Sequence, residues 1–214
     1  MADLILALDV VKRDVALSVA KSCAPHIDAI KIGYPLVLGA GLSIARELTD
    51  LRLPLIADFK IADIPNTNTL ITEQVFDAGF SAIICQGFTG TDSVRACVQA
   101  AHRKGGECYV VAEMSHPGAT EFFVPGIPEQ IAANAMVAKA DGIIAPATRP
   151  DRVKTLRGII GTRKILSPGI GAQGGDVHAV AGLVDGVIVG RSIYGAENPV
   201  RAAQEFSRDL GVRR

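Results

Sequence analysis

Short apolar runs alternate with longer amphipathic stretches along almost the whole of this 214-residue chain. Several of the short runs are apolar throughout, which is typical of strands covered on both faces, and the stretches between them have helical periodicity. Eight such strand–helix units predict a parallel (β/α)8 barrel, the TIM barrel, with a doubly wound open sheet as the alternative. Strands are expected at residues 4–8, 29–33, 54–59, 82–86, 108–112, 142–145, 164–167 and 186–190, and helices at 13–23, 42–50, 66–78, 92–104, 129–140, 149–160, 176–183 and 199–210.

The composition predicts a single domain, residues 1–214, with a large core, because 49% of the residues are hydrophobic. The 22 basic and 22 acidic residues balance, which argues against a nucleic-acid or membrane-surface protein. No apolar run approaches the roughly 18 residues of a membrane span. The start of the chain lacks a signal-peptide pattern and the four cysteines lack CxxC spacing, so we expect a cytoplasmic protein with reduced cysteines. The four histidines show no metal-ligand spacing.

The segment Asp58-Phe-Lys-Ile-Ala-Asp-Ile-Pro65 carries two carboxylates and an ammonium group directly after an apolar run. Side chains at positions i and i+2 of a strand share a face, so Asp58 and Lys60 should point the same way and Phe59 the other way. Charges at the end of a buried strand need partners, and the carboxyl ends of barrel strands are where enzymes of this fold place their catalytic groups. The segment therefore predicts catalysis, with a structural cluster of ion pairs as the alternative.

Further polar residues follow other predicted strands, and each alone is compatible with an ordinary strand-end charge. In a barrel, however, all carboxyl ends of the strands meet around one mouth. Two lysines and three aspartates are then expected to converge as an array of alternating charges, formed by Asp9, Lys31, Asp58, Lys60 and Asp63.

A glycine-rich segment, Pro168-Gly-Ile-Gly-Ala-Gln-Gly-Gly175, contains the pattern G-x-G-x-x-G. A dinucleotide site would have this pattern early in a βαβ unit, with an acidic residue about 20 positions on, whereas position 189 is Val. After a seventh strand the segment instead predicts a phosphate site, in which backbone N–H groups cradle the anion. Gln173 and Arg191 would add side-chain donors; the alternative is a flexible turn beside a surface arginine.

Two other loops carry candidate ligand contacts. Met114-Ser-His-Pro-Gly118 follows the fifth predicted strand, and we interpret Ser115 as a residue that hydrogen-bonds a substrate. A Ser next to a His in sequence is not a catalytic triad, and G-x-S-x-G is absent. Thr67, just after Pro65, is placed to cap a helix or to contact a ligand.

Taken together, these motifs resemble orotidine 5′-monophosphate decarboxylase. The resemblance extends in order from residue 4 to residue 194, nearly the whole chain. Related sugar-phosphate enzymes share the D-x-K-x-x-D element, whereas Lys31 and the Ser115 loop are more specific. The resemblance implies a cofactor-free (β/α)8 barrel that acts as a homodimer and makes UMP and CO2 in pyrimidine synthesis. Gln86 stands at a strand end where relatives often carry His.

The resemblance also implies a role for each candidate residue. Lys60 would donate a proton to C6 of the pyrimidine, and Asp58 would lie against the substrate carboxylate. Lys31 would hold the charge network and reach the ribose. Asp63 and Thr67 would be contributed across the dimer interface. The remaining implied substrate contacts are Asp9 to a ribose hydroxyl, Ser115 to the pyrimidine amide, and Pro168, Gly169, Ile170, Gln173, Gly190 and Arg191 around the phosphate.

Two competing functions remain. Mg²⁺-dependent ketogulonate-phosphate decarboxylases and hexulose-phosphate synthases share the D-x-K-x-x-D element, but they carry a Glu metal ligand near the position of Lys31. A lysine at that position would repel a divalent cation, so we expect no metal here. A non-catalytic sensor of phosphorylated ligands is the other alternative, and the intact Lys60 argues against it.

Overall fold

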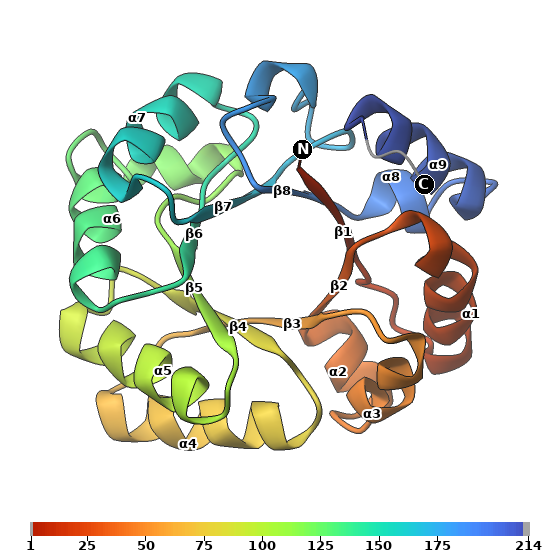
Figure 1. Cartoon of the computed structure of the whole chain (residues 1–214), viewed down its shortest axis with the longest axis horizontal. Helices are drawn as coiled ribbons and strands as arrows, with labels where there is room; N and C mark the ends of the chain where they lie inside the picture. Colours follow the sequence, from red (N-terminus) through yellow and green to blue (C-terminus); the bar gives the residue numbers. More distant parts are fainter. Residues whose placement is uncertain (1, 212–214) are drawn as a thin grey trace.

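Eight parallel strands close into a barrel in the computed structural model, which describes residues 2–211 (Figure 1). Each strand pairs with its neighbours in sequence order, and the last strand pairs with the first. The predicted (β/α)8 barrel is therefore confirmed, and the open-sheet alternative is wrong. The strands are β1 (Asp3–Ala7), β2 (Ala29–Gly33), β3 (Leu55–Ile61), β4 (Ala82–Gln86), β5 (Glu107–Val111), β6 (Gly142–Ile144), β7 (Lys164–Pro168) and β8 (Gly186–Val189).

The helices form a ring outside the barrel (Figure 1). Most of the predicted helices are present, with ends shifted by a few residues. The helices are α1 (Arg13–Cys23), α2 (Tyr34–Ala40), α3 (Ile44–Leu48), α4 (Pro65–Asp77), α5 (Thr91–Arg103), α6 (Ile127–Val137), α7 (Pro150–Ile160), α8 (Arg191–Tyr194) and α9 (Pro199–Asp209).

Three differences from the predicted helices have physical causes. The helix expected at 42–50 is present only as the short α3, which continues into the 3₁₀ turn Thr49–Leu51. The helix α2 before it was not expected, and Gly41, with φ +82°, separates the two. The helix expected at 176–183 is wrong: the segment holds only the 3₁₀ turn His178–Val180. The short helix α8 was not expected, since four residues are too few to give a periodic signal.

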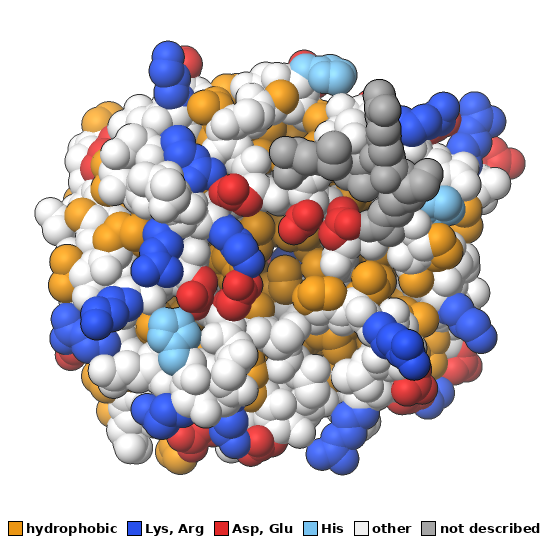
Figure 2. Space-filling model, in the orientation of Figure 1, with side chains coloured by type: hydrophobic (Ala, Val, Ile, Leu, Met, Phe, Trp, Pro, Cys, Tyr) orange, Lys and Arg blue, Asp and Glu red, His pale blue; other side chains and the backbone are white. Residues whose placement is uncertain are grey.

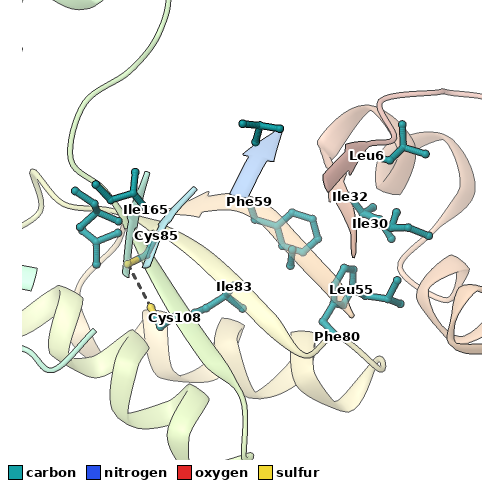
Figure 3. Packing of buried hydrophobic residues seen from close by; sticks show 14 of the residues in the cluster. Leu6, Ile30, Ile32, Leu55, Phe59, Phe80, Ile83, Cys85, Cys108 and Ile165 are labelled. Atoms are coloured by element: carbon teal, nitrogen blue, oxygen red, sulfur yellow. Dashed lines mark hydrogen bonds between the residues drawn. The ribbon is translucent and has the colours of Figure 1, made fainter. Parts of the chain in front are cut away.

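Side chains alternate between two hydrophobic layers along each strand. One layer fills the barrel, and the other lies between the strands and the helices. Phe59 belongs to the outer layer, where its ring stacks on Tyr34 with centroids 5.2 Å apart. Its ring also meets Phe80 edge-on, with centroids 5.8 Å apart, and both of these phenylalanines are labelled in Figure 3. Phe59 therefore points away from the barrel interior, as predicted.

All four cysteines are free and buried, as expected for reduced core residues. Cys85 and Cys108 lie on neighbouring strands with their sulfur atoms 3.7 Å apart (Figure 3). The thiol hydrogen bond with Cys108, and then burial, raise the pKa of Cys85. At Cys108 the same bond lowers the pKa, but burial together with the nearby Cys97 and Asp141 outweighs it and the pKa is raised, so both thiols stay protonated and unreactive.

The starts of the strands are fastened by a repeated hydrogen bond. The polar residue just before each even-numbered strand accepts a backbone N–H from the start of the preceding odd-numbered strand. The donor and acceptor pairs are Leu4 to Asp28 (2.8 Å), Leu55 to Ser81 (2.9 Å), Cys108 to Asp141 (2.8 Å) and Ile165 to Asp185 (2.8 Å).

A histidine contact and an ion pair lie beside these caps. His102 Nε2 lies 2.9 Å from Asp141 Oδ2, and Lys164 Nζ lies 2.7 Å from Glu107 Oε1. Figure 2 shows acidic and basic side chains gathered around the centre of the face that it depicts. Polar groups at the strand starts thus serve the barrel itself, which leaves the opposite ends of the strands for binding.

Candidate active site

A cavity of about 240 Å³ lies among residues at and beyond the carboxyl ends of the strands. This is the position where barrels of this type hold their active sites. Its wall combines charged, glycine-rich and apolar segments. The lining residues are Ala7, Asp9, Lys31, Asp58, Lys60, Ile84, Val111, Glu113, Met114, Ser115, Ile144, Pro168, Gly169, Ile170, Ala172, Gln173, Ile188, Gly190, Arg191 and Tyr194.

Lys31 occupies a position that is apolar on the equivalent strands. It is the third residue of β2, and the third residues of β4, β6 and β8 are all isoleucine: Ile84, Ile144 and Ile188. Lys31 is nevertheless only 6% exposed. Because a buried ammonium group is destabilising unless it is paired, the lysine marks this level of the barrel as a functional one.

Asp58 pairs with two lysines at once. Lys31 Nζ lies 2.6 Å from Asp58 Oδ2, and Lys60 Nζ lies 2.8 Å from Asp58 Oδ1. Burial alone would raise the pKa of Asp58, but the charges and hydrogen bonds of the two ammonium groups outweigh it, and the pKa is lowered. Asp58 is therefore ionised at neutral pH, and Asp58 and Lys60 share the cavity face, as predicted.

The backbone of β3 is irregular at the segment that carries Asp58 and Lys60. Its pairing with β4 shifts register between Ala57 and Ile61, and Lys60 adopts φ +46°. A residue with a side chain in this left-handed region is strained by roughly 1–2 kcal/mol, and such strain is concentrated at functional sites. The irregularity sets the direction of the Lys60 side chain where it meets Asp58.

Asp9 and Tyr194 flank one side of the cavity. A side-chain carbon on Gly33 would lie 2.8 Å from Asp9 Oδ1, so the glycine at the end of β2 lets the carboxylate approach. Burial and the nearby charge of Asp9 raise the pKa of the Tyr194 phenol. Tyr194 therefore stays protonated and can donate a hydrogen bond into the cavity.

The glycine-rich loop after β7 forms another part of the rim, next to α8. Gly169 and Gly171 adopt φ +102° and +71°, and Gly175 N donates to the Gly169 carbonyl at 2.9 Å, so the loop folds back on itself. Gln173 and Arg191 are exposed beside it. Free side-chain donors next to a tightly turned glycine loop suit an anion such as phosphate.

Two predicted site residues lie outside the described lining of this cavity. Asp63 is exposed and Thr67 is half-buried, both near the start of α4. The backbone at Asp63 is well held, because its N–H donates to Asn68 Oδ1 at 3.0 Å and its carbonyl accepts from Ser93 Oγ at 2.6 Å. The other predicted site residues are brought together: Asp9, Lys31, Asp58, Lys60, Ser115, Pro168, Gly169, Ile170, Gln173, Gly190 and Arg191.

Sequence reasoning missed part of the cavity wall. The apolar lining residues look like ordinary core residues in the sequence. Only the alternation of side chains along each strand, counted from its first residue, would have assigned them to the barrel interior. Tyr194 was missed because α8 was not expected, and Glu113 was not assigned to the site. The missed lining residues are Ala7, Ile84, Val111, Glu113, Met114, Ile144, Ala172, Ile188 and Tyr194.

Within residues 2–211, no three His, Cys, Asp or Glu side chains cluster so that they could hold a metal ion. The helices in this range are likewise all too short or too polar to cross a membrane.

Comparisons with known proteins agree over nearly the whole chain. A family model described as "Orotidine 5'-phosphate decarboxylase / HUMPS family" matches residues 2–206. The orotidine 5'-phosphate decarboxylase of Methanococcoides burtonii is 55% identical over 210 residues, which cover 97% of this chain and 96% of the relative. The enzyme of the same name from Thermococcus kodakarensis is 48% identical and covers 97% and 96%.

Solved structures give the same result. Orotidine 5'-monophosphate decarboxylase from Methanocaldococcus jannaschii, complexed with inhibitor BMP, superposes with a TM-score of 0.94 at 42% identity and covers 98% of this chain and 99% of its own. Orotidine 5'-phosphate decarboxylase from Pyrococcus horikoshii gives a TM-score of 0.89 at 42% identity and covers 98% and 100%.

Proposed function

The chain belongs to the orotidine 5'-phosphate decarboxylase / HUMPS family, and on that premise we propose that it is a carboxy-lyase that converts orotidine 5'-monophosphate (OMP) to UMP and CO2 in pyrimidine biosynthesis. The observation that carries the proposal is the array of Lys31, Asp58 and Lys60 in a cavity whose far rim suits a phosphate. No cofactor takes part, because the side chains themselves supply fixed charge and a proton.

Lys60 is the proton donor in this reaction. When the bond from C6 to the carboxylate breaks, its electron pair stays on C6, and the departing group leaves as neutral CO2. The Lys60 ammonium group stabilises that carbanion and then protonates it. At an effective dielectric constant near 20, a unit charge pair about 4 Å apart is worth roughly 4 kcal/mol.

Asp58 faces the substrate carboxylate, and Lys31 holds Asp58. Because the pKa of Asp58 is lowered, two negative charges are brought together in the substrate complex. Their repulsion is relieved when CO2 leaves, which favours the forward step. Ile84, Ile144 and Ile188, at the positions equivalent to Lys31, exclude water from the cavity. The interactions between charges in the cavity are therefore stronger than they would be in water.

The remote parts of the nucleotide supply binding energy. Arg191, Gln173 and the backbone at Pro168, Gly169, Ile170 and Gly190 grip the phosphate, Asp9 and Lys31 contact the ribose, and Ser115 contacts the pyrimidine amide. Binding at the phosphate offsets the unfavourable contact between the two carboxylates, so a distant group contributes to the rate as well as to affinity.

We also propose that the protein acts as a homodimer in which Asp63 and Thr67 complete the partner's site. Both residues lie outside the cavity of their own chain, and the neighbouring Ile64 is 65% exposed, as expected of an interface. The free thiols support a cytoplasmic location.

Loss of OMP absorbance, followed with purified protein, tests the reaction. The wild type should turn over OMP equally with and without EDTA. Lys60→Ala should lower kcat on the order of 10⁴-fold, because one substitution removes both the proton donor and the charge. Activity abolished by EDTA would favour a metal-dependent sugar-phosphate enzyme, and UMP binding without CO2 release would favour a sensor.

A further inference from the structure

Glu113 is a buried charge with no part in the reaction described above. Of the charged residues between 2 and 211, Lys31 and Glu113 are the two that are buried, at 6% and 2% exposure. Glu113 follows β5 and lines the cavity one residue before Met114 and two before Ser115. A buried carboxylate destabilises the fold unless it is paired, so its partners indicate its purpose.

Both oxygens of Glu113 are occupied by arginines at the start of α7. Oε1 accepts from Arg149 Nε and Oε2 from Arg152 Nε, each at 2.9 Å. Arg152 Nη1 donates in turn to Glu129 Oε1 on α6 at 2.7 Å, and this bond lowers the pKa of Glu129 to about 2. With both oxygens engaged, Glu113 is not free to bind a substrate directly.

Arg149 has a second contact, with the Ser115 loop (residues 114–118). Its Nη2 donates to the carbonyl oxygen of Met114. The adjacent Thr148 donates through Oγ1 to the carbonyl oxygen of Ser115 at 3.3 Å. Two consecutive carbonyls are thus held by two consecutive residues, and because peptide units are planar, this fixes the direction in which the Ser115 side chain leaves the backbone.

The same contact reaches the glycine-rich loop. A side-chain carbon on Gly169 would lie 2.9 Å from Thr148 Cγ2 and 3.5 Å from Ser115 Cβ. The loops after β5, β6 and β7 therefore meet at one point between the charge array and the phosphate rim.

We propose that Glu113 is a positioning residue for decarboxylation: it holds Arg149 so that Arg149 and Thr148 fix the Ser115 loop against the bound pyrimidine. The inference rests on the proposed function, since it assigns Glu113 a task in that site. It differs from a merely stabilising role, because the whole effect on catalysis passes through Ser115.

A double-mutant cycle tests this assignment. Glu113→Gln keeps the size of the side chain and removes its charge, and should lower kcat/KM for OMP on the order of 100-fold through misplacement of the loop. In a Ser115→Ala background the same substitution should have little further effect. Glu129→Gln is the matched control, because it removes the other carboxylate of Arg152 and leaves the contact between Glu113 and Arg149; it should lower Tm and leave kcat/KM unchanged.

Several results would overturn the inference. Equal kinetic effects of Glu113→Gln and Glu129→Gln, or full additivity of Glu113→Gln with Ser115→Ala, would show that Glu113 only stabilises the fold. If Glu113→Gln does not fold, Arg149→Lys is the deciding variant. It keeps a positive charge beside Glu113 but cannot also reach the Met114 carbonyl, so the same loss of kcat/KM is expected. An unchanged kcat/KM for Arg149→Lys would refute the inference. A folded wild type that does not turn over OMP would refute the proposed function as well.

Discussion

Lys60 combines the proposed role of proton donor with a backbone conformation that side chains rarely adopt, φ +46°. The strain belongs to the backbone and not to the amine, so the two are separable by substitution. Lys60→Ala and Lys60→Gly both remove the ammonium group, but only glycine is free of strain at a positive φ.

We therefore expect Lys60→Gly to be more stable than Lys60→Ala by about 1 kcal/mol. Urea unfolding of the two variants at neutral pH measures the difference. The expected order is the reverse of that in a regular strand, where glycine is the less stable choice. A Lys60→Ala variant as stable as Lys60→Gly would mean that the backbone at this position is relaxed.

Asp58 links the charge array to the pH dependence of stability. Its pKa is lower in the folded protein than in an unfolded chain, so its pairing with Lys31 and Lys60 stabilises the fold above about pH 4. That contribution is lost as the pH falls through the folded-state pKa, whereas Asp58→Asn never has it.

The stability gap between wild type and Asp58→Asn should consequently shrink in acid, by at most about 1.4 kcal/mol per pH unit. Free energies of unfolding measured from pH 7 to pH 3 give the gap directly. A gap that stays constant over this range would contradict the lowered pKa of Asp58.

Polar and apolar site residues differ in how far the sequence reveals them. Asp58 and Lys60 were predictable because a charge after an apolar run needs a partner. Ile84 and Ile188 were not, because an isoleucine that lines a cavity and one that fills a core satisfy the same alternation. The left-handed conformation of Lys60 has no sequence signal at all, since lysine ordinarily avoids it.

At the scale of elements, the strands and long helices were predictable and the short connections were not. A strand such as β4 is set by its own apolar run, and its predicted ends, 82 and 86, are confirmed. α2 begins at Tyr34-Pro35, where proline suits the first turn of a helix. Its seven residues follow β2 directly, so hydrophobic periodicity does not separate the helix from the strand. The segment 176–183 has helical composition but forms only a short turn.

The strand-start caps also act at the scale of elements. A substitution in a cap should change the stability of the protein without changing its catalytic rate. Asp141→Ala removes the acceptor for Cys108 N–H and the partner of His102. The unsatisfied N–H should destabilise the fold by about 2 kcal/mol. kcat and KM for OMP should not change, because the cap lies at the end of the barrel opposite the cavity.

Chemical denaturation and the OMP assay together check this prediction. Asp50→Ala, at an exposed position, is the control and should alter stability by no more than about 0.5 kcal/mol. A fall in kcat for Asp141→Ala under conditions where it is fully folded would show that the two ends of the barrel are coupled.

At the scale of the whole molecule, the exposed Asp63 and the half-buried Thr67 raise the question of whose site they serve. If they serve the partner's site, Lys60→Ala and Asp63→Ala damage the two sites of a mixed dimer unequally. Both defects then fall in one site, and the other site is intact.

Mixing the two inactive variants should therefore restore up to about a quarter of wild-type activity after random exchange of subunits. Each variant mixed with itself is the control, and differently tagged chains report the exchange. Purified mixed dimers without activity would assign Asp63 to the site of its own chain.

The hydrogen bonds from Asp28, Ser81, Asp141 and Asp185 give the barrel a foundation that is remote from substrate. Residues around these four positions can therefore be substituted in selections for heat resistance while the residues that recognise the nucleotide stay unchanged. A thermally hardened descendant obtained in this way should inherit the parent's substrate preference unaltered.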